Sequence, residues 1–218
     1  MKNNVTELVF IIDRSGSMFG LEDDTIGGFN STLEEQKTLD GTVFVTTWLF
    51  SDNSVMVHDR KLLPSVEPMT RKEYYVGGCT ALYDAVGEAI KHISCIHKYA
   101  CPDDVPAHTI FVIITDGMEN ASRSYRGSDI KRMISEATEK NGWKFVFLGA
   151  NIDTESVAEN IGIRKEFAAD FDTTGDGISD CYGRVSRAVM YSRAFPDKDG
   201  VPSSEEIDDI MKILRKKK

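Results

Sequence analysis

The sequence predicts an α/β fold with three layers: an open sheet of about six strands, mostly parallel, with one antiparallel edge strand and helices on both faces. Short apolar runs, typical of strands buried on both faces, alternate with segments whose apolar residues recur every three or four positions. Residues 42–50 and 55–58 are separated only by a polar turn and predict a hairpin. Alternating strands and helices indicate a parallel, Rossmann-like sheet, and the hairpin adds the antiparallel edge.

The predicted elements follow one another with short connections. Strands are predicted at residues 8–12, 42–50, 55–58, 108–114, 143–148 and 166–171. Helices are predicted at residues 22–37, 81–99, 130–141, 153–162, 178–195 and 203–214, with Ser128 and Asp129 capping the third of them. Two prolines in residues 61–68 predict a surface connection. Residues 172–177 are acidic and rich in Gly, but they lack the ligand spacing of a calcium loop, and we expect a flexible loop there.

Length and composition limit the function classes. At 218 residues, the chain suits one domain over residues 1–195, followed by a linker and an amphipathic C-terminal helix over residues 196–218. The net charge of −9 argues against a nucleic-acid partner. No apolar run has the length of a signal peptide or a membrane span, so we expect a cytoplasmic protein without a membrane partner. The four cysteines lack the spacing of a zinc site, and we expect free, buried thiols.

Oxygen-bearing side chains gather at the ends of two predicted buried strands. The first strand runs into Asp13, and Ser15 and Ser17 follow it around Gly16. A second buried strand ends at Asp116. If the two strands are neighbours in the sheet, their carboxylates converge, although spacing along the chain does not decide this. Carboxylate and hydroxyl oxygens suit a hard cation such as Mg²⁺.

Five positions then resemble a known site. Asp13-x-Ser15-x-Ser17, Thr80 in a Gly-Gly-Cys-Thr turn and Asp116 in Thr-Asp-Gly resemble, in this order, the metal-ion-dependent adhesion site (MIDAS) of the von Willebrand factor type A (vWA) family. The resemblance covers roughly residues 5–195. It implies that the two strands are neighbours and that the five side chains hold Mg²⁺ or Mn²⁺ between them.

The resemblance also implies a function and a kind of partner. A vWA domain with this site is a cation-dependent protein-binding module, in which a carboxylate of the partner completes the coordination of the metal. We therefore expect a protein partner that presents an acidic residue, with an AAA-type ATPase complex as one candidate. Positions near the motif suggest rim contacts to the partner at Met18, Phe19, Tyr75, Met118, Glu119 and Asn120.

Two alternatives remain open. The first is a Mg²⁺-dependent hydrolase or phosphotransferase that uses Asp13 as nucleophile. We expect no enzyme, because Ser15 stands where haloacid-dehalogenase-like enzymes need a second Asp, and the sequence has no phosphate-binding lysine loop or nucleophile elbow. The second is a structural assembly component without metal, in which Asp13, Thr80 and Asp116 only cap helices or turns and the C-terminal helix docks on a neighbour or on its own domain.

Overall fold

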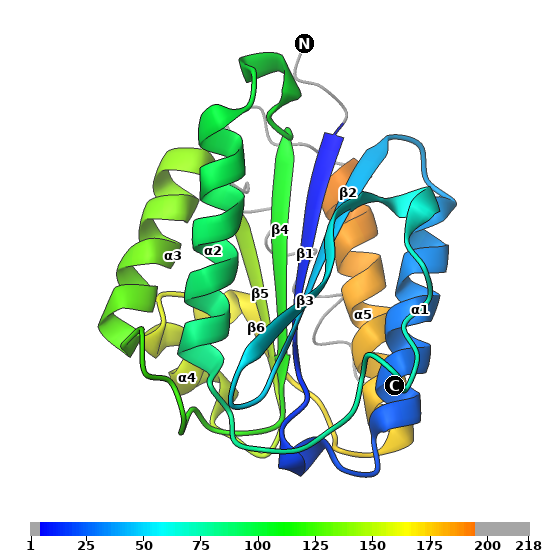
Figure 1. Cartoon of the computed structure of the whole chain (residues 1–218), viewed down its shortest axis with the longest axis vertical. Coiled ribbons are helices and arrows are strands. Elements are labelled where there is room, and N and C mark those ends of the chain that lie inside the picture. Colours follow the sequence, from blue (N-terminus) through cyan, green and yellow to red (C-terminus); the bar gives the residue numbers. More distant parts are fainter. Residues whose placement is uncertain (1–4, 195–218) are drawn as a thin grey trace.

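Six strands form one sheet in the computed structural model of the chain, which describes residues 5–194 (Figure 1). The strands are β1 (Val5–Asp13), β2 (Thr42–Phe50), β3 (Ser54–Leu62), β4 (His108–Thr115), β5 (Lys144–Gly149) and β6 (Ala168–Asp170). Their order across the sheet is β3-β2-β1-β4-β5-β6. All neighbouring pairs are parallel except β2 and β3, which form the predicted hairpin at one edge. The predicted fold class is confirmed.

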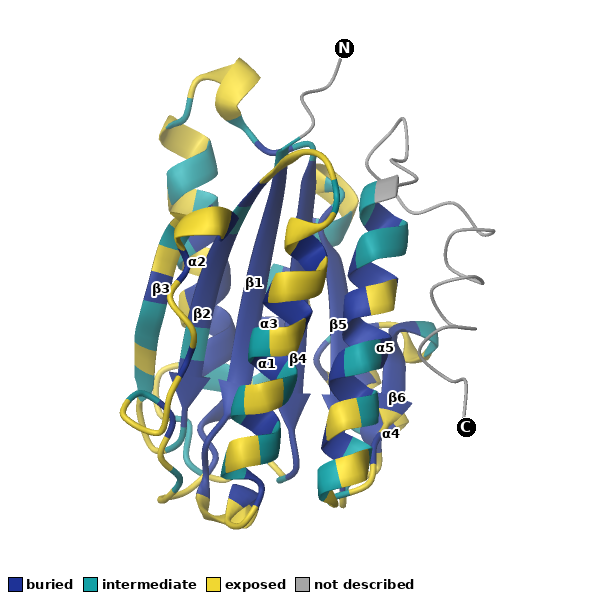
Figure 2. Cartoon of the chain, turned by 90° about the vertical axis from the view of Figure 1, so that its right-hand side faces the viewer, coloured by how far each residue is buried: buried dark blue, intermediate teal, exposed yellow. Residues whose placement is uncertain are grey.

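Five α-helices cover the two faces of this sheet within the described residues. They are α1 (Glu22–Lys37), α2 (Leu82–Tyr99), α3 (Gly127–Asn141), α4 (Thr154–Asn160) and α5 (Gly175–Ala194). The helices α1 and α5 pack together on one face, whereas α2 and α3 pack together on the other, with α4 beside α3 (Figure 1). Figure 2 shows that α1 and α5 are buried on the side toward the sheet and largely exposed on the outer side. None of the described helices is long and apolar enough to cross a membrane.

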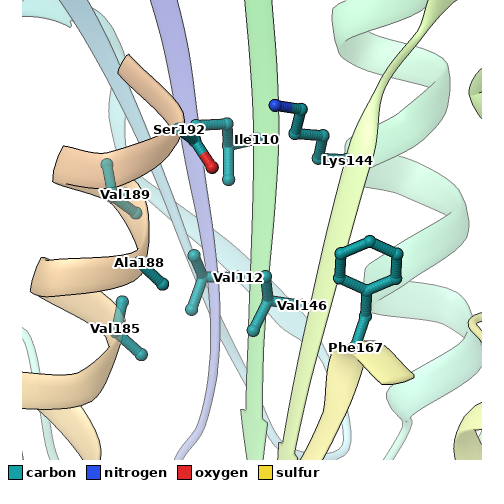
Figure 3. Close-up of a pocket in the computed structure, with 9 residues that line it drawn as sticks. All are labelled: Ile110, Val112, Lys144, Val146, Phe167, Val185, Ala188, Val189 and Ser192. Carbon is teal, nitrogen blue, oxygen red and sulfur yellow. The ribbon is translucent and has the colours of Figure 1, made fainter. Parts of the chain in front are cut away.

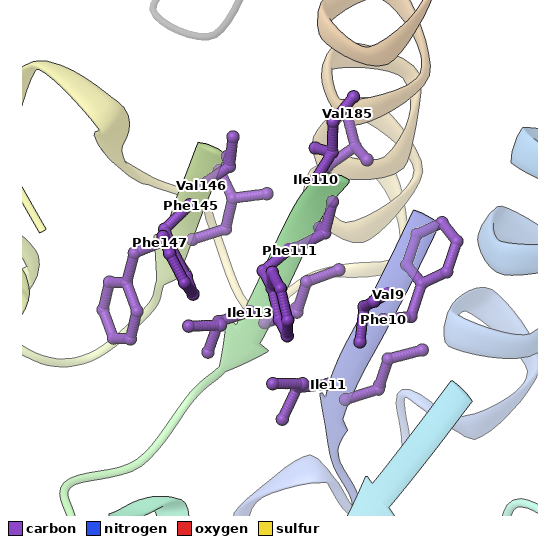
Figure 4. Close-up of a cluster of buried hydrophobic side chains, with 14 of the residues drawn as sticks. Val9, Phe10, Ile11, Ile110, Phe111, Ile113, Phe145, Val146, Phe147 and Val185 are labelled. Atoms are coloured by element: carbon purple, nitrogen blue, oxygen red, sulfur yellow. The ribbon is translucent and has the colours of Figure 1, made fainter. Parts of the chain in front are cut away.

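The central strands β1 and β4 supply most of the core. Every residue of β4 is buried, and β1 is buried from its second residue onwards. Side chains of β1, β4 and β5 stand in rows beside one another (Figure 4). Because helices cover both faces, neither strand has a solvent side, which explains its continuous apolar run. Each fully buried large apolar side chain contributes about 1.5–3 kcal/mol, so these strands fix the position of whatever follows them.

The seam between α5 and the sheet is closely packed. A cavity of about 10 Å³ lies there, which is room for roughly one water molecule. Figure 3 shows the side chains that line it: Ile110, Val112, Lys144, Val146, Phe167, Val185, Ala188, Val189 and Ser192. Small-molecule sites need about 300 Å³ or more, so this seam serves packing.

The connection after β3 differs from the predicted surface loop. The strand β3 continues to Leu62, and a short 3-10 turn, Leu63–Ser65, follows it. The side chains of Leu63, Val66 and Met69 are buried against the core. The amide of Met69 donates to Asn30 Oδ1 at 2.8 Å, and Asn30 Nδ2 donates back to the Met69 carbonyl at 2.9 Å. The two prolines therefore end regular structure without detaching the segment from the domain.

Several predicted boundaries were also wrong. The helix α5 begins at Gly175, so residues 175–177 belong to a helix rather than to a flexible loop, and the Thr174 hydroxyl accepts the Gly177 amide at 3.1 Å. Ser128 lies inside α3 rather than before it. The strand β6 has three residues rather than six, because a 3-10 turn occupies Lys165–Phe167. The predicted linker and helix of residues 196–218 lie outside the described residues.

The cysteines are free, as predicted, but only Cys181 is buried. The other three, Cys79, Cys95 and Cys101, are exposed, so their predicted burial was wrong.

Candidate metal centre

The two aspartates of the motif meet at the carboxyl edge of the sheet. Asp13 is the last residue of β1, and Asp116 directly follows β4. The strands β1 and β4 are parallel neighbours, with Ile12 opposite Ile114. The adjacency that spacing could not decide is therefore present, and both aspartate side chains lie at the same point of the rim.

The loop after β1 links three of the predicted residues to Asp116. The Ser15 amide donates to Asp13 Oδ1 at 2.7 Å, which curls the chain back toward the strand end. A 3-10 turn, Gly16–Met18, then brings Ser17 Oγ to 3.0 Å from Ser15 Oγ. Ser17 Oγ donates to Asp116 Oδ1 at 2.5 Å. Asp13, Ser15, Ser17 and Asp116 thus form one connected hydrogen-bonded set.

A second loop brings Thr80 to the same place. The Gly16 amide donates to the Gly78 carbonyl at 3.0 Å, and the Gly77 amide donates to the Arg14 carbonyl at 2.9 Å, so the two loops run side by side. Gly78 has φ of +81°, a left-handed conformation that favours glycine. A methyl group placed on Gly117 would lie 3.1 Å from Thr80 Oγ1 and 3.4 Å from Ser17 Oγ, so both hydroxyls lie close beside Gly117, next to Asp116. All five predicted residues come together.

Thr80 does not cap α2. The residue that precedes the helix is Ala81, and the first-turn amides of residues 83 and 84 donate to Glu119 Oε2 and Ser122 Oγ rather than to Thr80. The backbone of Thr80 is instead held by Asn120: the Thr80 amide donates to Asn120 Oδ1 at 2.8 Å, and the Asn120 amide donates to the Thr80 carbonyl at 3.0 Å. The capping role that the structural alternative assigned to Thr80 is therefore absent.

Both carboxylates are buried and short of positive charge. Asp13 is fully buried, and burial raises its pKa to about 6; hydrogen bonds from Thr115 and Ser15 oppose this rise, whereas the charge of Asp116 adds to it. Burial also raises the pKa of Asp116, against the hydrogen bond from Ser17. Asp116 Oδ2 is buried and accepts no hydrogen bond. The ion pairs among residues 5–194 include neither aspartate.

This donor set fits a hard divalent cation. Two desolvated carboxylates with a free oxygen need a compensating positive charge, and three hydroxyl oxygens stand beside them. Within the described part of the chain, no cluster of three or more His, Cys, Asp or Glu side chains could hold a metal. A metal here would therefore depend on hydroxyls as well as carboxylates.

Supporting residues surround this centre, and sequence reasoning missed them. Thr115 Oγ1 donates to Asp13 Oδ2 at 2.6 Å, and the Tyr74 hydroxyl donates to the Asp13 carbonyl at 2.7 Å. Thr115 could have been found, because it stands directly before Asp116. Tyr74 gives no such signal, because it lies 61 positions from its partner.

The predicted rim contacts divide into three groups. Phe19, Tyr75 and Met118 are exposed by 80%, 60% and 67%, as contacts to a partner require. Met18 is buried in the core, so its prediction was wrong. Glu119 accepts the amides of residues 83, 121 and 122 and, like Asn120, holds the loops together.

No protein-family model and no curated protein matches the sequence. Solved structures do resemble it. A mutant of the PilB minor pilin from Streptococcus sanguinis has 12% identity, covers 87% of this chain and 62% of its own, and gives a TM-score of 0.63. A von Willebrand factor type A structure from Catenulispora acidiphila has 14% identity, with 87% and 43% covered and a TM-score of 0.56.

Proximal thread matrix protein 1 from the mussel byssus, with a zinc-occupied MIDAS motif, is a third such structure. It has 15% identity, with 87% of this chain and 47% of its own covered, and a TM-score of 0.57. The chain thus spans less than two thirds of each of these three proteins. At these identities the likeness concerns the fold, and the chain has the fold of vWA domains.

Proposed function

We propose that this chain is a divalent-cation-dependent protein-binding module, with Asp13, Ser15, Ser17, Thr80 and Asp116 holding Mg²⁺ or Mn²⁺. The observation that carries the proposal is the meeting of two buried, unpaired carboxylates with three hydroxyls at one point of the rim. The zinc in the MIDAS of a protein with the same fold supports a divalent metal in general. Magnesium and manganese are proposed from the oxygen-rich donor set.

Some residues of the site would offer oxygen ligands to the cation, and others would orient those ligands. Asp116 Oδ2 offers a free carboxylate oxygen, and the hydroxyls of Ser15, Ser17 and Thr80 offer neutral ones. Thr115 and the Ser15 amide hold the Asp13 carboxylate in place. Such outer hydrogen bonds orient ligands and tune affinity. When bound, the cation would compensate both carboxylates and leave a coordination position for a carboxylate of the partner.

The proposed partner is a protein that presents an acidic residue beside an apolar contact. Phe19, Tyr75 and Met118 are large, exposed side chains on three loops of this rim, and exposed aromatic residues are common at interfaces. Arg14 lies over the Tyr75 ring at 4.3 Å and steadies it. The choice of an AAA-type ATPase complex, the cytoplasmic location and the absence of enzymatic activity stay predictions from the sequence.

Calorimetric titration with Mg²⁺ and with Mn²⁺ tests the metal site. Thr80→Ala removes one hydroxyl, whereas Thr80→Ser keeps it and serves as the matched control. We expect Thr80→Ala to lower metal affinity by about tenfold or more and Thr80→Ser to change it little. Thermal unfolding in chelator checks that both variants fold. Wild type that binds neither cation, or equal affinity in both variants, would contradict the proposal.

Capture of partners from a cell extract tests the binding function. A partner should bind wild type in Mg²⁺, leave on addition of chelator, and fail to bind Thr80→Ala. A partner held equally well by both proteins in chelator would show that binding does not use the metal.

A further inference from the structure

A groove lies between α2 and α3, on the outer surface of the face opposite α1 and α5. The two helices run side by side in Figure 1. The groove has a volume of about 400 Å³ and is lined by their C-terminal halves. Ile90, Met133 and Ala137 contribute apolar surface to it, and Cys95 lies on its wall. Both helices begin at the metal rim and run away from it, so the groove is remote from the candidate metal centre.

The walls of this groove are positively charged, although the chain carries −9. Lys91, Lys98 and Lys140 line it together with a single acidic residue, Glu136. Lys140 Nζ lies 3.6 Å from Glu136, whereas Lys91 and Lys98 form no ion pair within the described residues. Lys98 Nζ lies over the Tyr99 ring at 5.4 Å. An apolar surface flanked by lysines, two of them without a carboxylate partner among the described residues, suits an acidic amphipathic helix.

The chain contains such a segment beyond the described residues. Residues 203–214 carry five apolar side chains, of which those at positions 207, 210, 211 and 214 form one stripe in helical register, whereas Ile213 lies outside it. Glu206 and Asp208 fall on either side of that stripe, about 100° from its first residue. The four acidic residues of the segment lie in its first half, at positions 205, 206, 208 and 209, whereas Lys212 and the basic run at residues 215–218 lie at its C-terminal end. We propose that residues 203–214 dock as a helix in the α2–α3 groove of the same chain, with the stripe facing Ile90 and Met133 and the carboxylates facing the lysines.

The connection is long enough for this docking. The helices α2, α3 and α5 each begin beside the metal rim and run antiparallel to the parallel strands of the sheet, so all three end at the opposite edge. Packed layers lie about 10 Å apart, which places the two helix layers about 20 Å from each other. Residues 195–202 number eight and span at most about 26–29 Å when extended. The segment can therefore pass over this edge and reach the groove.

The exposed Cys95 provides a direct test in the full-length chain. Modification of each cysteine by N-ethylmaleimide is followed by mass spectrometry in wild type, in Ile210→Asp and in Asp209→Asn. Ile210 lies on the apolar stripe and Asp209 on the far side of the helix. We expect Ile210→Asp to increase the modification rate of Cys95 at least threefold and to leave that of the exposed Cys101 unchanged. Asp209→Asn should leave both rates unchanged. Equal Cys95 rates in wild type and Ile210→Asp would overturn the proposal.

Cross-linking identifies which chain supplies the helix. In a background of Cys79→Ser and Cys101→Ser, Ile210→Cys should form a disulfide with Cys95 on mild oxidation, whereas Asp209→Cys should not. The product should be a monomer with altered mobility on a non-reducing gel. Linked dimers would show that a second copy fills the groove, and no linkage would show that it stays open; either result overturns docking within the chain. Neither experiment depends on bound metal.

Discussion

Replacing Asp13 with Asn should make the metal-free protein more stable while removing its affinity for metal. The pKa of Asp13 rises from 3.8 to about 6, mainly because the carboxylate is buried. Each unit of pKa corresponds to about 1.4 kcal/mol, so the ionised carboxylate costs the folded state about 3 kcal/mol at pH 7. Asn has nearly the same shape and carries no charge.

The neighbours of Asp13 can accommodate this change. The Ser15 amide, now 2.7 Å from Oδ1, can donate to the amide oxygen of the new side chain. The Thr115 hydroxyl, now 2.6 Å from Oδ2, can turn and accept from the new amide nitrogen. We therefore expect a gain of about 1–3 kcal/mol, which raises the midpoint of thermal unfolding by about 3–10 °C for a domain of this size.

The sign of the pH dependence separates charge from packing. Because the pKa of Asp13 is raised in the folded state, its ionised carboxylate destabilises the fold fully above about pH 6. Below 3.8, the pKa in the unfolded chain, the carboxyl is protonated in both states and this destabilisation is absent. Urea unfolding in chelator should therefore show a smaller difference in the free energy of unfolding between Asp13→Asn and wild type at pH 4.5 than at pH 7. A variant no more stable than wild type at pH 7, or a gap independent of pH, would refute the reasoning.

Asp153 supplies the matched control for this experiment. Hydrogen bonds from Ser156 lower its pKa, so its charge stabilises the folded state. Asp153→Asn should therefore lose stability at pH 7, opposite in sign to Asp13→Asn. Mg²⁺ at a thousand times its Kd should then reverse the order of wild type and Asp13→Asn, because a ligand at that concentration adds about 4.1 kcal/mol to the protein that binds it.

Glycine substitutions test the packing that positions the site. In α1, an added methyl group at Gly28 would collide with the Tyr182 ring, whereas the same group at Gly27 meets nothing within 4 Å. Urea unfolding should show Gly28→Ala losing about 1–3 kcal/mol and Gly27→Ala unchanged or stabilised by up to about 1 kcal/mol. At Gly78, an alanine would have to adopt a left-handed φ, and its methyl group would collide with the Asp52 carboxylate. Gly78→Ala should therefore lower both the free energy of unfolding and the Mg²⁺ affinity measured by calorimetry. An unchanged Mg²⁺ affinity would contradict the loop geometry.

The sequence was sufficient for the class of fold because its strands are buried on both faces. Continuous apolar runs and intervening periodic helices leave a covered parallel sheet as the arrangement that buries them all. The position of the candidate metal centre was harder to predict from the sequence. Asp13 and Asp116 are 103 positions apart along the chain, and only the order of strands in space makes them neighbours. That order came from the resemblance to vWA domains rather than from the residues themselves.

Burial in the connections could not be predicted, because it depends on tertiary contacts. Met18 follows two serines and a glycine, but the 3-10 turn places it in the core. Leu63 and Met69 lie among prolines and polar residues, yet they cover the apolar edge of the domain. In each case local composition indicated a loop. Whether that loop is exposed or buried depends on contacts with residues distant in sequence.

The contrast between aspartates argues against a purely structural role for the candidate metal centre. An aspartate that only caps a helix or turn accepts nearby amides and has a lowered pKa, as Asp153 does. Asp13 and Asp116 also accept hydrogen bonds, yet burial raises the pKa of both. Asp116 Oδ2 is left with no partner at all among the described residues. A neutral side chain would serve a turn better in that environment, whereas a divalent cation gives the two buried charges a physical reason to be there.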